Sequence, residues 1–236
     1  MKDKGQIKEL FASISGSYDS LNQLFSLGMA RFWRQMAAAR MPAKGPYLDL
    51  CAGTLELSLT LLKQKKTEVG ITAVDFCPAM LVRGRNKLIQ GERGQSWVEN
   101  IEILAGDGEH LPLRENIYQG VMIGFGLRNL INREAGLKEI LRVLKPGGRL
   151  VVLEFSDPIL PFFRHLYYLY FCHILPPLGN LLSKRDMAYN HLRDSVLAFP
   201  NRDELASMFL STGFVRVRYQ ILTYGIAALH WGEKPE

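Results

Sequence analysis

Short apolar runs alternate with amphipathic segments between residues 47 and 156, and this alternation constrains the fold most. The runs are rich in Leu, Ile and Val, as buried strands are. The segments between them carry apolar residues at three- and four-residue spacing, as helices do. The expected strands are 47–51, 70–76, 101–107, 120–126 and 149–156, and the expected helices are 55–66, 78–90 and 133–144. Strands that alternate with helices favour an α/β fold with a doubly wound, mostly parallel sheet.

The chain on either side of this alternation is organised differently. Helical spacing dominates before it, and the aromatic, apolar stretch after Ser156 shows helical spacing without a strand. Near the end, a helix stopped at Gly213 precedes two candidate strands, 214–222 and 227–233, which predict an antiparallel edge. We expect one domain over 1–236, with N-terminal helices (1–40), a cofactor-binding core (47–156), a helical insertion (157–200) and a C-terminal helix and hairpin (201–236).

Composition argues against several function classes. The 236 residues carry a net charge of +6 without a run of five basic residues, so we expect no nucleic-acid partner. Cys51, Cys77 and Cys172 form no CxxC pair, so neither a bound metal nor a disulfide framework is expected. The chain shows neither a leader-like apolar segment nor an apolar run of about 20 residues. We expect a cytoplasmic protein, and its positive charge leaves attraction to a membrane surface open.

Acidic, glycine and threonine residues lie at the carboxyl ends of four of the expected strands or just after them. They are Gly53 and Thr54, Asp75, Asp107 with Gly108, and Gly124. The turn at Gly53, in YLDLCAGTLELSL, lets the backbone approach a ligand closely. Asp75, about twenty residues later, suits the hydroxyls of a ribose, and Asp107 can accept a hydrogen bond from an adenine amino group. Because ligands of open α/β sheets bind at the carboxyl ends of strands, these residues predict a cofactor site.

Two cofactors are compatible with such a site, a dinucleotide and S-adenosylmethionine. A dinucleotide requires a G-x-G-x-x-G turn so that the backbone can approach the pyrophosphate, and this chain lacks that pattern. S-adenosylmethionine carries no phosphate and needs fewer glycines. The sequence therefore favours S-adenosylmethionine.

Four segments carry a resemblance to a known family. They are YDSLNQLFSLGMARFW (18–33), FGLRN (125–129), RVLKPGGRLVVLEFS (142–156) and GIAALHWGEK (225–234). Together they resemble the ubiquinone/menaquinone biosynthesis C-methyltransferases, and the resemblance covers nearly the whole chain. It implies a Rossmann-like class I methyltransferase fold and methyl transfer from S-adenosylmethionine to a ring carbon of a polyprenylated quinol. The naphthoquinol demethylmenaquinol and its benzoquinol counterpart both remain open as acceptors.

The chemistry needs a group that stabilises a phenolate and a group that accepts a proton. Arg128, in FGLRN, is our candidate for the first, although pairing with a carboxylate is an alternative interpretation. His173 is our candidate base or proton relay, and Tyr189 lies in the same stretch, which matches the family's acceptor region. A core role for each of them is the alternative. The insertion either covers the sheet or forms an apolar tunnel for a prenyl tail at the inner face of a membrane.

Departures from the family pattern leave other functions open. Leu55 replaces the glycine that family members carry after Gly-Thr, and we expect its side chain to crowd the cofactor and to resist a positive φ. The alternatives are methylation of another small hydrophobic acceptor, or a binding or regulatory role with impaired catalysis. A homodimer is one option for the oligomeric state.

Overall fold

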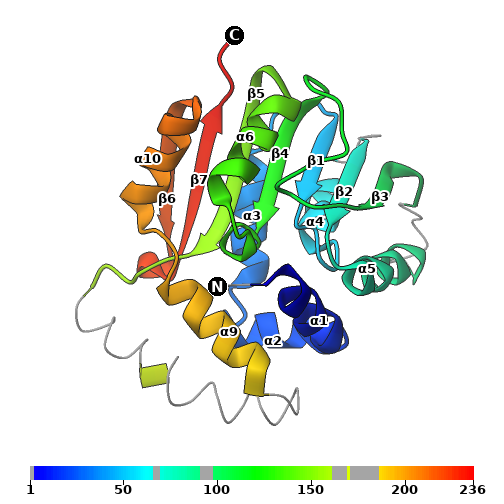
Figure 1. The fold of residues 1–236 in the computed structure, drawn as a ribbon, viewed down its shortest axis with the longest axis vertical. Helices are drawn as coiled ribbons and strands as arrows, with labels where there is room; N and C mark the ends of the chain where they lie inside the picture. The colour runs from blue at the N-terminus through cyan, green and yellow to red at the C-terminus, as the bar shows by residue number, and fades with distance from the viewer. Residues whose placement is uncertain (1–2, 66–69, 91–97, 161–168, 171–185) are drawn as a thin grey trace.

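The computed structural model describes residues 3–65, 70–90, 98–160, 169–170 and 186–236, and for residues 25 and 186–190 it describes the backbone alone (Figure 1). The described strands form one sheet, and described helices pack on both of its faces. No described helix has the length and apolar character that a membrane crossing requires.

The sheet has seven strands in the order β3-β2-β1-β4-β5-β7-β6. The strands are β1 (Tyr47–Leu50), β2 (Ile71–Asp75), β3 (Ile101–Ala105), β4 (Tyr118–Gly124), β5 (Leu144–Phe155), β6 (Val215–Leu222) and β7 (Ala227–Glu233). The first five strands are parallel, whereas β7 lies antiparallel to both β5 and β6. The expected α/β class with an antiparallel edge is confirmed.

Strand β5 begins earlier than the sequence suggested. Helix α6 (Arg133–Val143) ends one residue before the expected end at 144, and β5 starts at once at Leu144 and continues through the KPGG segment. The pairing of β5 with β4 shifts register between Tyr118 and Gly120, and Gly147 adopts φ +71°. A glycine tolerates this conformation, so the KPGG segment becomes an irregular stretch of strand and not a loop.

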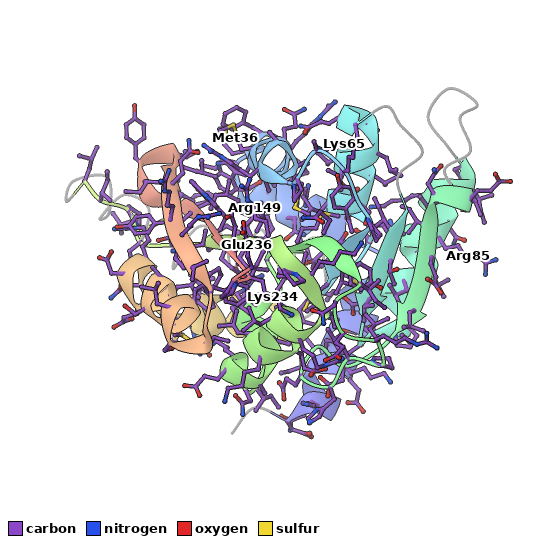
Figure 2. The ribbon with its side chains drawn as sticks, turned by 90° about the horizontal axis from the view of Figure 1, so that it is seen from above. Met36, Lys65, Arg85, Arg149, Lys234 and Glu236 are labelled. Carbon is purple, nitrogen blue, oxygen red and sulfur yellow. The ribbon has the colours of Figure 1, made fainter. Side chains whose placement is uncertain are left out.

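Two apolar layers cover the sheet. One core holds side chains from α3 (Ala30–Arg40), α4 (Glu56–Lys65) and α5 (Pro78–Gln90), and the other holds side chains from α6 and α10 (Arg202–Thr212). Figure 2 shows helices on both sides of the sheet from above. Arg149 of β5 joins the sheet to α3, because its guanidinium donates to Glu233 of β7 and to the carbonyl of Arg40 at the end of α3.

Three further helices lie beyond the carboxyl ends of the parallel strands. They are α1 (Lys4–Ile14), α2 (Tyr18–Phe25) and α9 (Asp186–Leu197) (Figure 1). Short helical turns complete the described elements: η1 (Val98–Asn100), η2 (Leu127–Asn129) and η4 (Thr223–Gly225). The sheet thus presents its strand ends to a layer built from both the N-terminal region and the segment after β5.

Candidate active site

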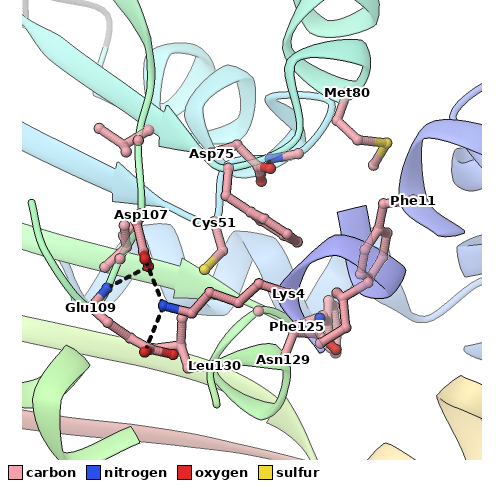
Figure 3. A pocket seen from close by; sticks show the side chains of 18 of the residues that line it. Lys4, Phe11, Cys51, Asp75, Met80, Asp107, Glu109, Phe125, Asn129 and Leu130 are labelled. Carbon is pink, nitrogen blue, oxygen red and sulfur yellow. Dashed lines mark hydrogen bonds and ion pairs between the residues drawn. The ribbon is translucent and has the colours of Figure 1, made fainter. Parts of the chain in front are cut away.

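A pocket lies where the carboxyl ends of β1, β2, β3 and β4 meet helix α1 (Figure 3). The loops after these strands contribute Cys51, Gly53, Phe76, Gly108 and Phe125, among others. Helix α1 closes the pocket from the opposite side with the side chains of Lys4, Ile7 and Phe11. The position agrees with the strand-end site expected from the sequence.

The loop after β1 is shaped by residues in the left-handed region. Cys51, Gly53 and Leu55 have φ values of +57°, +53° and +63°. Asp49, at 1% exposure, fixes the following helix, because its carboxylate accepts hydrogen bonds from the backbone N–H (3.1 Å) and the hydroxyl (2.6 Å) of Ser58. Burial raises the pKa of Asp49 to about 7. The backbone of this loop is therefore held tightly at the pocket floor.

Asp75 joins two of the loops that form the pocket. One carboxylate oxygen accepts the N–H of Gly53 at 2.9 Å, and the other accepts the N–H of Cys77 at 2.8 Å. Burial raises the pKa of Asp75 to about 6, and the two backbone donors oppose part of that shift. A carboxylate has about four acceptor positions, so Asp75 retains capacity for the hydroxyl donors of a ligand.

An ion-pair cluster occupies another wall of the pocket. The ammonium group of Lys4 lies 2.6 Å from a carboxylate oxygen of Asp107 and 2.8 Å from one of Glu109 (Figure 3). These contacts raise the pKa of Lys4, with the hydrogen bond to Asp107 as the largest cause. For Asp107 the lowering effect of Lys4 and of the Glu109 N–H exceeds the effect of burial, so its pKa falls. The cluster holds helix α1 against the end of β3.

Four of the six expected cofactor residues line the pocket, and two do not. Gly53, Asp75, Asp107 and Gly108 are lining residues, whereas Thr54 and Gly124 are not. The hydroxyl of Thr54 donates to Asp19 of α2 at 2.7 Å, so its side chain serves the contact with α2. The space beside Gly124 is taken by Leu57, whose Cδ2 lies 3.3 Å from where a Cβ would stand.

The expected effect of Leu55 on the cofactor is wrong. Its side chain is fully buried and does not line the pocket. It packs against Gly84 of α5, where a Cβ would collide with Leu55 Cγ. Leu55 also adopts φ +63°, the left-handed conformation that its branched side chain was expected to resist. The glycine at position 84 creates the space that accepts this side chain.

A second cavity adjoins the first. Its walls come from α1, α2, η2 and α9, and they are mainly apolar, with polar groups from Tyr18, Asn22, Arg128 and His191. Phe11 and Tyr18 line both cavities and form the wall between them. Burial raises the pKa of Tyr18 above its usual value of 10, although the charge of Arg128 opposes this, so its phenol stays protonated near neutral pH.

Arg128 is buried, at 3% exposure, and lies in an ion pair. Its Nη1 donates to Glu154 at 2.7 Å, and its backbone N–H donates to the other oxygen of the same carboxylate at 3.2 Å. The guanidinium also lies over the rings of Phe125 and Phe155, 5.9 and 5.4 Å from their centroids. Arg128 thus lines the second cavity and has the carboxylate partner of the alternative interpretation, while its role toward an acceptor stays a prediction.

The other two expected acceptor residues are not tested by the structure. His173 lies outside the described residues, and Tyr189 falls on α9 where the backbone alone is described. Sequence reasoning missed His191, two residues later, whose Nε2 lies 3.1 Å from Oδ1 of Asn129. It also missed Lys4. Neither residue has a local sequence signal, because each acts through a contact between distant segments.

The described residues contain no cluster of three or more His, Cys, Asp or Glu side chains that could hold a metal ion. The site consists of buried carboxylates, loop backbone and an adjoining apolar cavity with a fixed cation. Such a pair of cavities can hold a polar nucleoside-like ligand beside an apolar one.

Solved structures of low sequence identity share this fold. An S-adenosylmethionine-dependent methyltransferase from Thermotoga maritima superposes with a TM-score of 0.67 at 17% identity, covering 96% of this chain and 99% of that one. The [4+2]-cyclase SpnF superposes with a TM-score of 0.65 at 16% identity, covering 87% and 81%. Because the second protein is named for a different reaction, these likenesses establish the fold alone.

Curated relatives and a family model are more specific. The ubiquinone/menaquinone biosynthesis C-methyltransferase UbiE of Geotalea daltonii is 38% identical, with 99% of each chain covered. The demethylmenaquinone methyltransferase of Deinococcus radiodurans is 43% identical, with 99% of this chain and 95% of that one covered. The model of the ubiE/COQ5 methyltransferase family matches residues 1–234. The chain therefore belongs to the ubiE/COQ5 methyltransferase family.

Proposed function

We propose that this methyltransferase carries a methyl group from S-adenosylmethionine to a ring carbon of a polyprenylated quinol, and that demethylmenaquinol is the acceptor. The proposal is supported by family membership and by relatives named as demethylmenaquinone methyltransferases. The structural observation that carries it is the pair of cavities that share Phe11 and Tyr18 as a common wall. One cavity has the carboxylates for a nucleoside, and the other has the apolar walls and the cation for a quinol.

The residues of the first cavity fit S-adenosylmethionine. Asp75, buried at the end of β2, keeps acceptor positions for the two ribose hydroxyls beyond its bonds to Gly53 and Cys77. Asp107 and Gly108 follow β3, where Asp107 can accept from the adenine amino group. The loop at Gly53 offers backbone to the methionine part. When bound, S-adenosylmethionine supplies an electrophilic methyl group on a positively charged sulfur.

Arg128 then acts on the acceptor. A quinol ring carbon becomes nucleophilic when the neighbouring phenol loses its proton, because the negative charge spreads to the ortho position. The guanidinium of Arg128, held by Glu154, stabilises the charge on that oxygen as it develops. Arg128 cannot remove the proton itself, because a guanidinium remains protonated. Interactions that strengthen toward the transition state raise the rate, so Arg128 acts chiefly on the maximal rate.

The experiment is transfer of labelled methyl to reduced demethylmenaquinone and benzoquinone analogues, with cofactor affinity measured in parallel. Transfer to the naphthoquinol at the higher kcat/KM supports the proposal, and absence of transfer to both classes contradicts it. Arg128→Lys should retain part of the rate, because a point charge lacks the planar fork. Arg128→Ala should lose about 100- to 1,000-fold in kcat.

Because Arg128 lies in a buried ion pair, Arg128→Ala can lower activity through a loss of stability as well as through a loss of catalysis. Removing one partner of such a pair leaves an uncompensated charge and costs about 3–5 kcal/mol of stability. A double variant, Arg128→Met with Glu154→Gln, removes both charges and separates folding from catalysis. The role of Arg128 requires this variant to fold and bind cofactor while turning over slowly.

We also propose that the protein meets its lipid-like substrate at a membrane surface. Exposed apolar side chains at Ile159, Leu160 and Leu169 support such a contact. Sedimentation with vesicles of neutral and anionic lipid tests this contact. Light scattering of the same protein without vesicles tests whether it forms a homodimer.

A further inference from the structure

We propose that His191 is the proton acceptor for the phenol of the quinol and that Asn129 positions its imidazole. This inference rests on the proposed function and names the base for that reaction. The geometry behind it is the junction of the two cavities. His191 lines the acceptor cavity, Asn129 lines the cofactor cavity, and the two side chains meet across the boundary.

The contact with Asn129 sets the tautomer of the imidazole. Nε2 of His191 lies 3.1 Å from Oδ1 of Asn129. An amide oxygen accepts and does not donate, so Nε2 carries the hydrogen that forms this bond. In the neutral ring, the basic lone pair is then on Nδ1. Phe11 of α1 adds an edge contact, with ring centroids 6.1 Å apart at an interplanar angle of 85°.

The other polar groups that line the acceptor cavity among the described residues are poor bases. Tyr18 stays protonated near neutral pH because burial raises its pKa. Arg128 is a guanidinium, and the side-chain amide of Asn22 does not accept a proton at neutral pH. His191 is the lining group whose side-chain type titrates near neutrality.

Within the described part of the chain, two elements of the cavity wall face His191 with ionisable groups. Tyr18 comes from α2 and Arg128 from η2, whereas α1 presents the uncharged ring of Phe11. On its own helix, the neighbouring Arg193 and Asp194 bond to each other at 2.9 Å. The ion pair with Glu154 holds the guanidinium of Arg128 in place beside the oxygen that loses its proton.

The protons and electrons of the methyl transfer balance with His191 as the one base. The phenol O–H bond breaks, and its proton moves to Nδ1 of His191. The ring carbon then supplies both electrons of its new bond to the methyl group, and the electron pair of the broken carbon–sulfur bond stays on sulfur. The ring C–H bond breaks next, its proton passes to water, and its electrons restore the aromatic ring. The oxygen takes back the proton held by His191, so one proton is released per methyl group.

The first test measures ionisation in the acceptor cavity without the cofactor. The probe is 1-naphthol bound to the full chain, with the absorbance of its anion followed against pH. In His191→Gln, which keeps an amide able to bond Asn129, the apparent pKa of bound naphthol should rise by about one unit, in the range of shifts that one nearby group causes. Arg193→Gln, on the same helix and outside the cavity lining, is the matched control and should leave it unchanged.

The second test measures turnover and cofactor binding. Loss of a positioned base costs about 100-fold or more, so His191→Gln should lower kcat by that factor while the Kd for S-adenosylmethionine stays the same. Asn129→Ala should lower kcat less and should shift the naphthol titration in the same direction, as a positioning residue would.

Equal naphthol titrations for wild type and His191→Gln would overturn the assignment, and so would a failure of naphthol to bind the wild type. A naphthol shift in a protein that methylates neither quinol class would keep His191 as the proton acceptor of this cavity. That same result would contradict a quinol as the substrate. Failure of the base assignment and failure of the proposed function therefore give different results.

Discussion

The backbone N–H of Gly53 donates to the carboxylate of Asp75 over 2.9 Å, so the end of β2 holds the loop that follows β1. The other oxygen of Asp75 holds the turn at Cys77. A residue expected to bind ribose therefore also shapes the loop expected to meet the methionine part of the cofactor. Changes at Asp75 act on both.

Replacement of Asp75 by alanine should weaken the binding of S-adenosylmethionine without unfolding the protein. A hydrogen bond to a charged group contributes about 1.5–3 kcal/mol, which corresponds to a rise in Kd of about 10- to 150-fold. Asp75→Asn keeps an amide oxygen for one backbone donor and should lose less. Titration calorimetry measures both variants, with Glu99→Ala, an exposed carboxylate, as the control. An unchanged Kd in Asp75→Ala would remove this residue from the cofactor site.

Cofactor binding should depend on pH through the same carboxylate. Its pKa lies at about 6 without ligand, and ribose hydroxyls donate to the ionised form. Binding therefore lowers the pKa of Asp75 and releases a proton at and just below pH 6. Affinity should fall as pH decreases below 6, by at most about tenfold per unit for one proton.

Calorimetry at pH 5.5 in two buffers of different ionisation enthalpy detects the released proton. The two enthalpies should differ for the wild type and agree for Asp75→Asn. Equal enthalpies in the wild type would contradict this linkage.

Leu55→Gly should lower stability and leave cofactor affinity unchanged, whereas a side chain that crowds the cofactor, as the sequence suggested, would predict a gain in affinity. Because the side chain is buried against Gly84, its loss leaves a cavity, and a buried leucine replaced by alanine costs about 2–5 kcal/mol. Glycine removes the strain at φ +63°, which is about 1–2 kcal/mol, so Leu55→Gly should cost no more than Leu55→Ala. Denaturant unfolding measures both. The Kd for S-adenosylmethionine should stay within about twofold, and a clear gain in affinity would place Leu55 in the pocket after all.

Elements with strong local signals were predicted well from the sequence. Helix α5 begins at Pro78 and ends at Gln90 as expected, because proline suits a first helical turn and the apolar spacing is regular. Strand β7 also has its expected bounds, 227–233. The start of β5 at Leu144 was missed, because Pro and Gly signal a turn and a strand can pass through them only with an irregular register.

The site was predicted where it depends on strand ends and missed where it depends on tertiary contacts. Asp75 ends β2 and Asp107 lies just after β3, and the sheet brings strand ends together. Lys4 meets Asp107 across 103 positions of the chain, and His191 meets Asn129 across 62. No local pattern encodes such contacts. Thr54 had the right position in the sequence, but a carboxylate on α2 takes its hydroxyl.

Lys4→Met should increase the affinity for S-adenosylmethionine modestly. Lys4 holds the carboxylate of Asp107, which is our expected acceptor for the adenine amino group, so ligand and lysine compete for it. Both side chains are more than a third exposed, at 43% and 38%, and exposed ion pairs contribute about 0–1 kcal/mol. The Kd should therefore fall by at most about fivefold.

The matched control for this variant is Lys8→Met, an exposed lysine on the same helix. Limited proteolysis without ligand should cut the N-terminal helix faster in Lys4→Met, because the cluster that holds it is gone. Weaker cofactor binding in Lys4→Met would show that the lysine assists the ligand.

Phe11 and Tyr18 line both cavities, and we expect this shared wall to couple ligand binding in one cavity to ligand binding in the other. A ligand that orders these rings in one cavity fixes the surface that the other ligand meets, so each should change the affinity of the other. Such coupling is reciprocal: the factor by which naphthol changes the Kd of the cofactor must equal the factor by which the cofactor changes the Kd of naphthol. Two aromatic side chains would then let an enzyme with two adjacent sites favour the complex in which both are filled.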